Sequence, residues 1–254
     1  MKDNIERWLI CPDLQIPFED PKALAVFEKY MAAHRWDGLL YIGDFLDFDM
    51  ISSFNSSKPR LTQNRYIHND YAYANKILDR HQAILRKKNP RAKFVMLEGN
   101  HEERIERFID GIPALQGTLE VTKGLRLKER GITWVRSWSK GEVYKIGKAS
   151  FTHGLYTNMY HAKKMLDAEA ASIFYGHTHD MMCIPRTRRD KHDLQVGQSL
   201  GCLCDIEQSY MKGKPSNWQQ GFGVFFFLPD GSYTYYTPRI IAHRFIGPDG
   251  ILYE

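Results

Sequence analysis

The chain contains 254 residues, with 35 lysines and arginines against 30 aspartates and glutamates, so its formal charge is +5. With 43% apolar and 13% aromatic residues it can bury a substantial core, which excludes a disordered chain. No apolar run approaches the ~20 residues of a membrane-spanning helix, and residues 1–7 lack the apolar centre of a signal peptide. We therefore expect a soluble, cytoplasmic protein with no membrane partner. The modest positive charge permits an anionic partner without requiring one.

The first elements predict a β-α-β unit. Residues 8–11 and 39–42 are short apolar runs bounded by polar residues, which is the pattern of buried strands. Between them, Asp20 and Pro21 provide an N-cap and a first-turn proline, and apolar residues follow at helical spacing. The helix so predicted joins the two strands.

The rest of the chain adds one long helix, further strands and hairpins. The helix is predicted over residues 69–88 and is ended by Pro90, while the polar, turn-rich residues 52–69 predict a surface loop. Two further strands are predicted at residues 94–97 and 172–175. Two hairpins are predicted, one joining residues 142–146 to 149–152 and one joining residues 224–228 to 232–236. This order predicts an α/β fold with mixed sheets covered by helices, in a single domain over residues 1–254.

Side chains that bind metals recur directly after the strand-like runs. In chain order the segments are Asp13-Leu14-Gln15, Gly43-Asp44-Phe45-Leu46-Asp47, Gly99-Asn100-His101-Glu102, His153-Gly154 and Gly176-His177-Thr178-His179. Each alone fits an ordinary role, such as a cap, a bend or a buried histidine. Together they offer carboxylate, amide and imidazole donors at the strand ends, where open α/β sheets place their sites. If the segment 177–179 is extended, its two histidines could each supply an imidazole to a different metal, which favours a two-metal site.

This series of segments resembles the calcineurin-like metallophosphoesterases, whose motifs are D-x-H, G-D-x-x-D, G-N-H-[ED], a histidine often followed by glycine, and G-H-x-H. The resemblance extends over residues 13–179, and its most specific parts are G-N-H-E and G-H-T-H. It implies a four-layer α/β/β/α sandwich of two mixed sheets flanked by helices. It also implies two divalent metal ions at the strand ends.

The resemblance further implies a role for each motif residue. Asp13, Gln15 and His179 would bind one metal, Asn100, His153 and His177 the other, and Asp44 would bridge the two. A hydroxide activated by both metals would attack phosphorus, while His101 assists the leaving oxygen. Asp47 has two equally weighted interpretations, which are orientation of His101 and capping of the following helix.

The first motif departs from the family pattern because Gln15 stands where the family has histidine. An amide offers a neutral oxygen instead of an imidazole nitrogen, which favours oxygen-preferring cations. We therefore expect Mn²⁺ as the best activator, with Mg²⁺, Fe²⁺ and Zn²⁺ as alternatives. The same departure motivates a non-enzymatic alternative, a degenerate binding module without metal.

The expected partner is a phosphate-ester substrate. A basic segment begins six residues after G-H-T-H, and its Arg186, Arg188 and Arg189 are predicted to contact substrate phosphates near the metals. This placement favours hydrolysis of phosphate diesters, with DNA, other nucleic acid or a nucleotide as substrate. The alternative is a phosphomonoesterase acting on a small phosphorylated molecule, and the sequence sets no oligomeric state.

A serine hydrolase is a further alternative. Residues 197–201 match the G-x-S-x-G pattern with Ser199 at its centre, and His243 follows with Asp205 or Asp230 between them. This interpretation would leave the five ligand-type segments without a purpose, so it ranks below the metallophosphoesterase.

Overall fold

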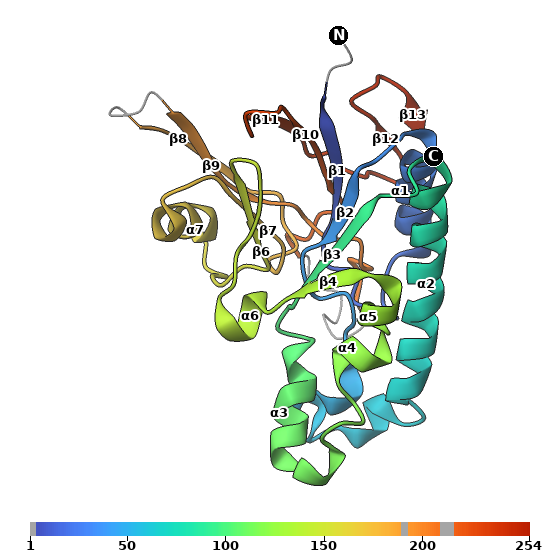
Figure 1. Ribbon diagram of the computed structural model, residues 1–254. Coiled ribbons are helices and arrows are strands. Elements are labelled where there is room, and N and C mark those ends of the chain that lie inside the picture. The colour runs from blue at the N-terminus through green and yellow to red at the C-terminus, as the bar shows by residue number, and fades with distance from the viewer. Residues whose placement is uncertain (1–3, 189–192, 209–215) are drawn as a thin grey trace.

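The computed structural model describes residues 4–188, 193–208 and 216–254. Two β-sheets pack against each other, and helices lie on the outer sides of the pair (Figure 1). The first sheet has the order β11-β10-β1-β2-β3-β4. Its strands are β1 (Glu6–Cys11), β2 (Gly38–Tyr41), β3 (Lys93–Leu97), β4 (Ile132–Val135), β10 (Gly223–Phe227) and β11 (Tyr233–Tyr236).

The second sheet has the order β5-β6-β7-β9-β8. Its strands are β5 (Tyr144–Ile146), β6 (Ala149–Thr152), β7 (Ile173–Tyr175), β8 (Cys183–Arg188) and β9 (Asp193–Ser199), and a separate hairpin pairs β12 (Phe245–Ile246) with β13 (Leu252–Tyr253). In the first sheet β1 to β4 run parallel, while β10 and β11 are antiparallel additions. In the second sheet β6, β7 and β9 run parallel, with β5 and β8 antiparallel at the edges. Both sheets are therefore mixed, as predicted.

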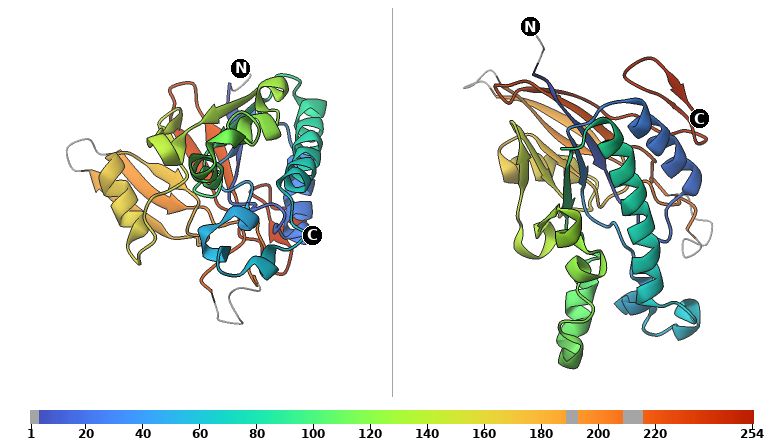
Figure 2. Two further views of the ribbon diagram at one scale, coloured as in Figure 1. Left: turned by 90° about the horizontal axis from the view of Figure 1, so that it is seen from below. Right: turned by 45° about the vertical axis from the view of Figure 1, so that its right-hand side comes forward.

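Helices cover the outer face of each sheet. The first sheet is covered by α1 (Pro21–Ala33) and α2 (Ile67–Lys88), which stand side by side in Figure 2. The Asp20 carboxylate accepts hydrogen bonds from the backbone N–H groups of Lys22 and Ala23, so the predicted N-cap of α1 is confirmed. The second sheet is covered by α7 (His161–Glu169).

Shorter helices occupy the connections. They are α3 (Glu103–Gly111), α4 (Val121–Gly124), α5 (Leu127–Arg130), α6 (Ser137–Lys140), and the 3₁₀ turns η1 (Asp49–Ile51), η2 (Ser53–Asn55), η3 (Pro59–Thr62) and η4 (Pro113–Leu115). The loop predicted over residues 52–69 therefore contains two 3₁₀ turns and the first turn of α2. No helix within the described ranges is both long enough and apolar enough to cross a membrane.

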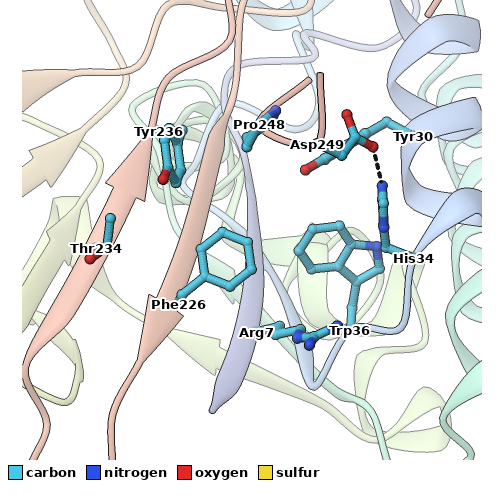
Figure 3. A pocket seen from close by; sticks show the side chains of 9 residues that line it. All are labelled: Arg7, Tyr30, His34, Trp36, Phe226, Thr234, Tyr236, Pro248 and Asp249. Carbon is cyan, nitrogen blue, oxygen red and sulfur yellow. Dashed lines mark hydrogen bonds and ion pairs between the residues drawn. The ribbon is translucent and has the colours of Figure 1, made fainter. Parts of the chain in front are cut away.

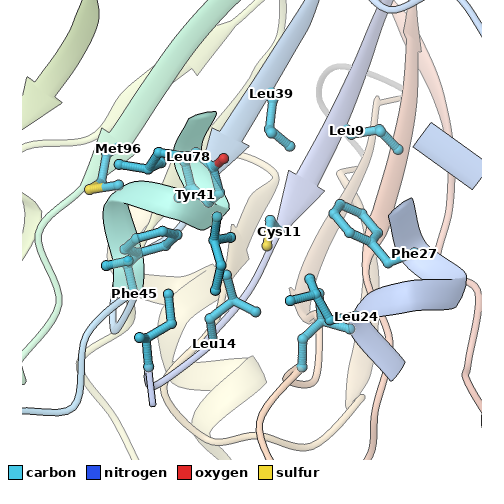
Figure 4. Close-up of a cluster of buried hydrophobic side chains, with 14 of the residues drawn as sticks. Leu9, Cys11, Leu14, Leu24, Phe27, Leu39, Tyr41, Phe45, Leu78 and Met96 are labelled. Carbon is cyan, nitrogen blue, oxygen red and sulfur yellow. The ribbon is translucent and has the colours of Figure 1, made fainter. Parts of the chain in front are cut away.

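Three apolar clusters separate four layers. The cluster between the helices and the first sheet joins Leu9 and Tyr41 to Phe27 of α1 and Leu78 of α2 (Figure 4). The neighbouring strand residues point the other way, so Ile10 packs in a second cluster with Phe151 and Phe174 of the second sheet. A third cluster joins β7 to Met165 of α7. The observed architecture is the predicted α/β/β/α sandwich.

Candidate metal centre

The five ligand-type segments meet where the two sheets adjoin. The segments that carry Asp13, Asp44 and Asn100 follow β1, β2 and β3, whose carboxyl ends lie at one edge because the strands are parallel. His153 directly follows β6, and His177 follows the parallel neighbour β7. Each sheet thus contributes loops to one site.

Within this site, two groups of potential ligands share one carboxylate. Asp44, His153 and His177 form one group, and Asp13, Asp44 and His179 form the other, with the ligand atoms of each group within 4.8 Å of one another. Asn100 Oδ1 lies 2.9 Å from His153 Nε2. The Gln15 side-chain amide lies 3.3 Å from His179 Nε2. The structure therefore brings all the predicted ligands together, and Asp44 belongs to both groups.

Charge and burial in the site suit a divalent cation. Burial opposes the charged form of Asp44, but the neighbouring His101 and His153 hold its pKa well below the usual range. Burial alone would lower the pKa of His153, but the Asp44 carboxylate outweighs it and raises that pKa to about 9. For His177, burial and the neighbouring His153 lower the pKa to about 3. Carboxylate oxygens and imidazole nitrogens therefore face one another at short range, and this donor set fits divalent metals.

Several ligand residues have an uncommon backbone conformation. Among the described residues, eleven other than glycine have positive φ, and five of these are predicted ligands: Asp13 (23°), Gln15 (51°), Asp44 (46°), His177 (68°) and His179 (58°). Such conformations cost about 1–3 kcal/mol each and concentrate at functional sites. The segment 177–179 is consequently bent, so the expectation of an extended chain is wrong. The two imidazoles still belong to different ligand groups.

Hydrogen bonds and glycines hold these loops in close contact. The His177 N–H donates to the Asp13 carboxylate at 3.0 Å, and the Gln15 N–H donates to the Asp44 carbonyl at 2.8 Å. A Cβ atom on Gly99 would lie 2.2 Å from Asp44 Oδ1, and one on Gly176 would lie 2.1 Å from Asp13 Oδ2. Only glycine allows the carboxylates to approach these backbone positions.

His101 and Asp47 adjoin the ligand groups. His101 Nε2 lies 3.6 Å from Asp44 Oδ2, and His101 Nδ1 lies 3.2 Å from Asp47 Oδ2, although the latter pair lacks the alignment of a hydrogen bond. Asp47 does not cap a helix, since Phe48 occupies the N-cap position of η1. Of the two interpretations of Asp47, the structure favours orientation of His101.

Arg104 is a site residue that the sequence analysis missed. Its guanidinium donates to His101 Nε2 at 2.7 Å, and to the backbone carbonyl of Asp47 at 2.6 Å. One residue on α3 therefore fixes both His101 and the Asp47 loop. Its position one helical turn after His101 is the signal that could have identified it.

Glu102 is a second missed residue. Its buried carboxylate accepts hydrogen bonds from the N–H groups of Asp44, Leu46 and Gly99, at 2.8–2.9 Å. Burial and the nearby Asp44 charge raise its pKa to about 7. Glu102 thus ties the loop after β2 to the loop after β3, and it was visible in the sequence as the last residue of G-N-H-E.

Aromatic rings and thiols surround the histidines. The Trp138 ring centroid lies 5.1 Å from that of His177, and the Trp218 centroid lies 4.1 Å from that of His179. Cys204 Sγ lies 3.9 Å from His179 Nδ1. The sequence motifs gave this cysteine no role.

The structure places Arg186 away from its predicted position beside the ligands. Arg186 pairs with Gln195 in the β8–β9 hairpin. Gln195 lies four residues, or about 13 Å of strand, before Ser199, and Ser199 pairs with Tyr175 at the carboxyl end of β7. Its guanidinium donates instead to Asp167 at 2.8 Å. Arg188 lies still farther along the hairpin, and Arg189 lies outside the described residues. The chain runs away from the site because β8 is a strand and not a short turn.

The structure also contradicts the serine-hydrolase alternative. Ser199 is fully buried at the end of β9, and its hydroxyl donates to the Asp180 carboxylate at 2.7 Å. His243 instead contacts Asp20, at 3.1 Å. The serine has neither an exposed hydroxyl nor the predicted histidine, so the glycine-rich segment is structural.

A separate pocket of ≈ 370 Å³ lies near the amino end of β1 (Figure 3). Aromatic residues such as Trp36 and Phe226 line it together with Arg7 and the His34–Asp249 pair. None of the predicted site residues belongs to this pocket. It is therefore distinct from the candidate metal centre.

No family model matches the chain. The Gene 54 protein of Mycobacterium phage D29 is 25% identical over 234 residues, and that of Mycobacterium phage L5 is 24% identical, each covering 86% of this chain and 88% of the relative. Among solved structures, Chaetomium thermophilum Vps29 matches with a TM-score of 0.45 and 12% identity over 97% of this chain and 92% of its own. The Pseudomonas putida nuclease MPE matches with a TM-score of 0.40 and 14% identity, over 90% and 87% of the two chains.

Proposed function

We propose that the protein is a metal-dependent phosphoesterase that hydrolyses phosphate diesters, with nucleic acid or a nucleotide as substrate. The observation that carries this proposal is the pair of ligand groups sharing Asp44. A shared carboxylate between two sets of oxygen and nitrogen donors suits two divalent ions, with Mn²⁺ expected as the best activator. When bound, two such ions supply Lewis-acid activation of water and of the phosphoryl oxygens.

The protein groups around these ions have separate tasks. Asp44 belongs to both ligand groups, while Asn100 adds an oxygen on the side of His153. Positive φ at five ligands, together with the Glu102 hydrogen bonds, fixes the donors before a substrate arrives. The site is therefore preorganised by the fold.

His101 is proposed to deliver a proton to the leaving oxygen. In the structure its Nε2 accepts a hydrogen bond from Arg104, and its Nδ1 faces Asp47. A substrate phosphate would attract the guanidinium, which releases Nε2 to protonation and to contact with the leaving oxygen. Arg104 thereby couples phosphate binding to the availability of His101.

Aromatic surroundings support a nucleic-acid or nucleotide substrate. Trp138 lies beside His177, and Trp218 lies beside His179, so indole rings flank both ligand groups. Both tryptophans are partly accessible. Stacking of a base on such a ring contributes about 1–3 kcal/mol and tolerates different bases. A small phosphomonoester lacking a ring would gain nothing from these side chains.

The test is a substrate panel measured with each metal. Single- and double-stranded DNA, bis-p-nitrophenyl phosphate and mono-p-nitrophenyl phosphate are incubated with Mn²⁺, Mg²⁺, Fe²⁺ or Zn²⁺, and with EDTA. We expect EDTA-sensitive cleavage of the diesters, fastest with Mn²⁺. Hydrolysis of the monoester alone would overturn the diester assignment in favour of a phosphomonoesterase. Absence of turnover with every metal would instead indicate a binding module.

A further inference from the structure

His179 also belongs to a third group of potential metal ligands, which contains two cysteines. Cys202 Sγ, Cys204 Sγ and a ring nitrogen of His179 lie within 4.8 Å of one another. Both cysteines are completely buried, and His179 is 3% exposed. None of the motifs in the sequence assigns these two thiols a role.

The His179 ring stands between two kinds of donor. Its Nε2 lies 3.3 Å from Asp13 Oδ1 and 3.3 Å from the Gln15 amide. Its Nδ1 lies on the other edge of the ring, 3.9 Å from Cys204 Sγ. One edge of the imidazole thus faces the Asp13 carboxylate and the Gln15 amide, and the other faces the Cys204 thiol.

The backbone holds the two thiols in place beside the Asp13 loop. Cys202 N–H donates to the Gln219 carbonyl at 3.0 Å, and Leu203 N–H donates to the Asp13 carbonyl at 3.1 Å. Bridges pair Cys202 with Gln220 and Cys204 with Glu19. In such an extended segment alternate side chains point the same way, so both sulfur atoms are directed to the same side.

We propose that Cys202, Cys204 and His179 form a binding site for a thiophilic divalent cation of the Zn²⁺ type. Two thiolates and one imidazole are the protein ligands of known Cys₂His zinc sites, and soft sulfur donors discriminate against Mn²⁺ and Mg²⁺. Binding displaces the two thiol protons to solvent. Ligation at Nδ1 leaves Nε2–H to donate to Asp13, an arrangement in which a carboxylate orients a metal-bound histidine.

This site competes with the oxygen-rich position for His179. A neutral imidazole has one free ring lone pair, so Nδ1 and Nε2 cannot both bind metal unless the ring loses its second proton. A Zn²⁺-type ion on the thiols therefore removes His179 from the group that contains Asp13 and Asp44. The competition rests on the proposed function, whereas binding to the thiols does not.

Binding is tested by titrating the protein with Co²⁺ in the presence of a phosphine reductant. We expect thiolate-to-cobalt absorption in the near ultraviolet and the intense visible bands of a tetrahedral ion. Cys202→Ser and Cys204→Ser should each lose these bands, while Cys183→Ser, which changes an exposed cysteine outside the cluster, should keep them. Absence of the bands in the unmodified protein, or their persistence in both cluster variants, would refute the site.

A second measurement needs no variant. X-ray absorption at the zinc edge of the unmodified protein with one equivalent of Zn²⁺ should show two sulfur neighbours at about 2.3 Å. A shell of nitrogen and oxygen alone would place Zn²⁺ in the oxygen-rich position and overturn the proposal. This result does not depend on any enzymatic activity.

Competition is tested by adding Zn²⁺ to the protein during Mn²⁺-dependent hydrolysis. We expect inhibition that is lost in the Cys202→Ser/Cys204→Ser double variant. Equal inhibition of both proteins would refute the competition. If no substrate is hydrolysed, the proposed function fails while the cobalt and zinc spectra still decide whether the thiols bind metal.

Discussion

The two sheets contribute different chemistry to the site. Loops of the first sheet supply the oxygen donors, which are Asp13, Gln15, Asp44 and Asn100, while loops of the second sheet supply the histidines His153, His177 and His179. Neither sheet by itself carries a complete ligand group, because each group combines carboxylate with imidazole. The candidate metal centre is therefore a property of the packing between the sheets.

Different hydrogen bonds hold the ligand loops of the two sheets in place. On the first side Glu102 joins the loops after β2 and β3 through backbone N–H groups. On the second side the Asp180 carboxylate accepts hydrogen bonds from Thr178 and Ser199, and its other oxygen lies 2.9 Å from His161 Nε2. A backbone contact on one side and a side-chain network on the other hold the donors at fixed positions.

The largest effect is expected for Asp44→Asn, which changes the carboxylate shared by both groups. Loss of one preorganised contact to the transition state typically lowers kcat by about 10²–10³-fold, and Asp44→Asn should lower activity further. At least one equivalent of metal should be lost, as measured by elemental analysis of the protein after gel filtration. The exposed Asp110→Asn is the matched control and should retain metal and activity. Full activity in Asp44→Asn would remove the basis of the proposed function.

His101→Ala should have the next largest effect. Loss of proton delivery lowers kcat by about 10²-fold or more, because general acid catalysis contributes on that scale. Metal content should stay unchanged, since His101 belongs to neither ligand group. A parallel loss of metal would show that His101 holds the site together and is not the proton donor.

Arg104→Ala should reduce kcat by about 10-fold, because the guanidinium positions His101 and the Asp47 loop. Arg104→Lys should recover part of this loss, since an ammonium can replace one of the two contacts. Steady-state kinetics on a diester separate kcat from KM. If Arg104→Ala is inactive only because it unfolds, circular dichroism will show the loss of structure.

Gln15→His replaces an amide on a loop of the first sheet by an imidazole, the type of donor that the loops of the second sheet supply. We expect the affinity for Zn²⁺ to rise about tenfold relative to Mn²⁺, which corresponds to about 1.4 kcal/mol. Competition between the two metals, followed by calorimetry, measures this ratio. An unchanged ratio would mean that Gln15 does not contact the metal.

The smallest effect is expected for Arg186→Ala. Because Arg186 lies along the β8–β9 hairpin and contacts Asp167, kcat/KM on DNA should change by less than about twofold. The measurement is made on protein shown to be folded by circular dichroism. A loss of tenfold or more would restore the basic segment to the substrate-binding surface.

Local sequence patterns were sufficient for most of the framework. The Asp20 cap and the strands before Asp13, Asp44 and Asn100 were predicted because capping and apolar runs depend on neighbouring residues. Strand β4 and the β8–β9 hairpin were missed. Thr133 interrupts the short strand β4 with an exposed polar side chain, and β8 contains Pro185 and two arginines, so neither strand has the continuous apolar pattern of a buried strand.

For the site, the sequence by itself determined which residues have metal-binding chemistry and that they follow strands. Only the tertiary structure decided that Asp44 belongs to both ligand groups, that Arg104 contacts His101, and that Cys204 approaches His179. The tertiary structure also decided that Arg186 lies away from the ligands. The physical reason is that donor type is a property of each side chain, whereas distances between residues far apart in the chain depend on how the two sheets pack.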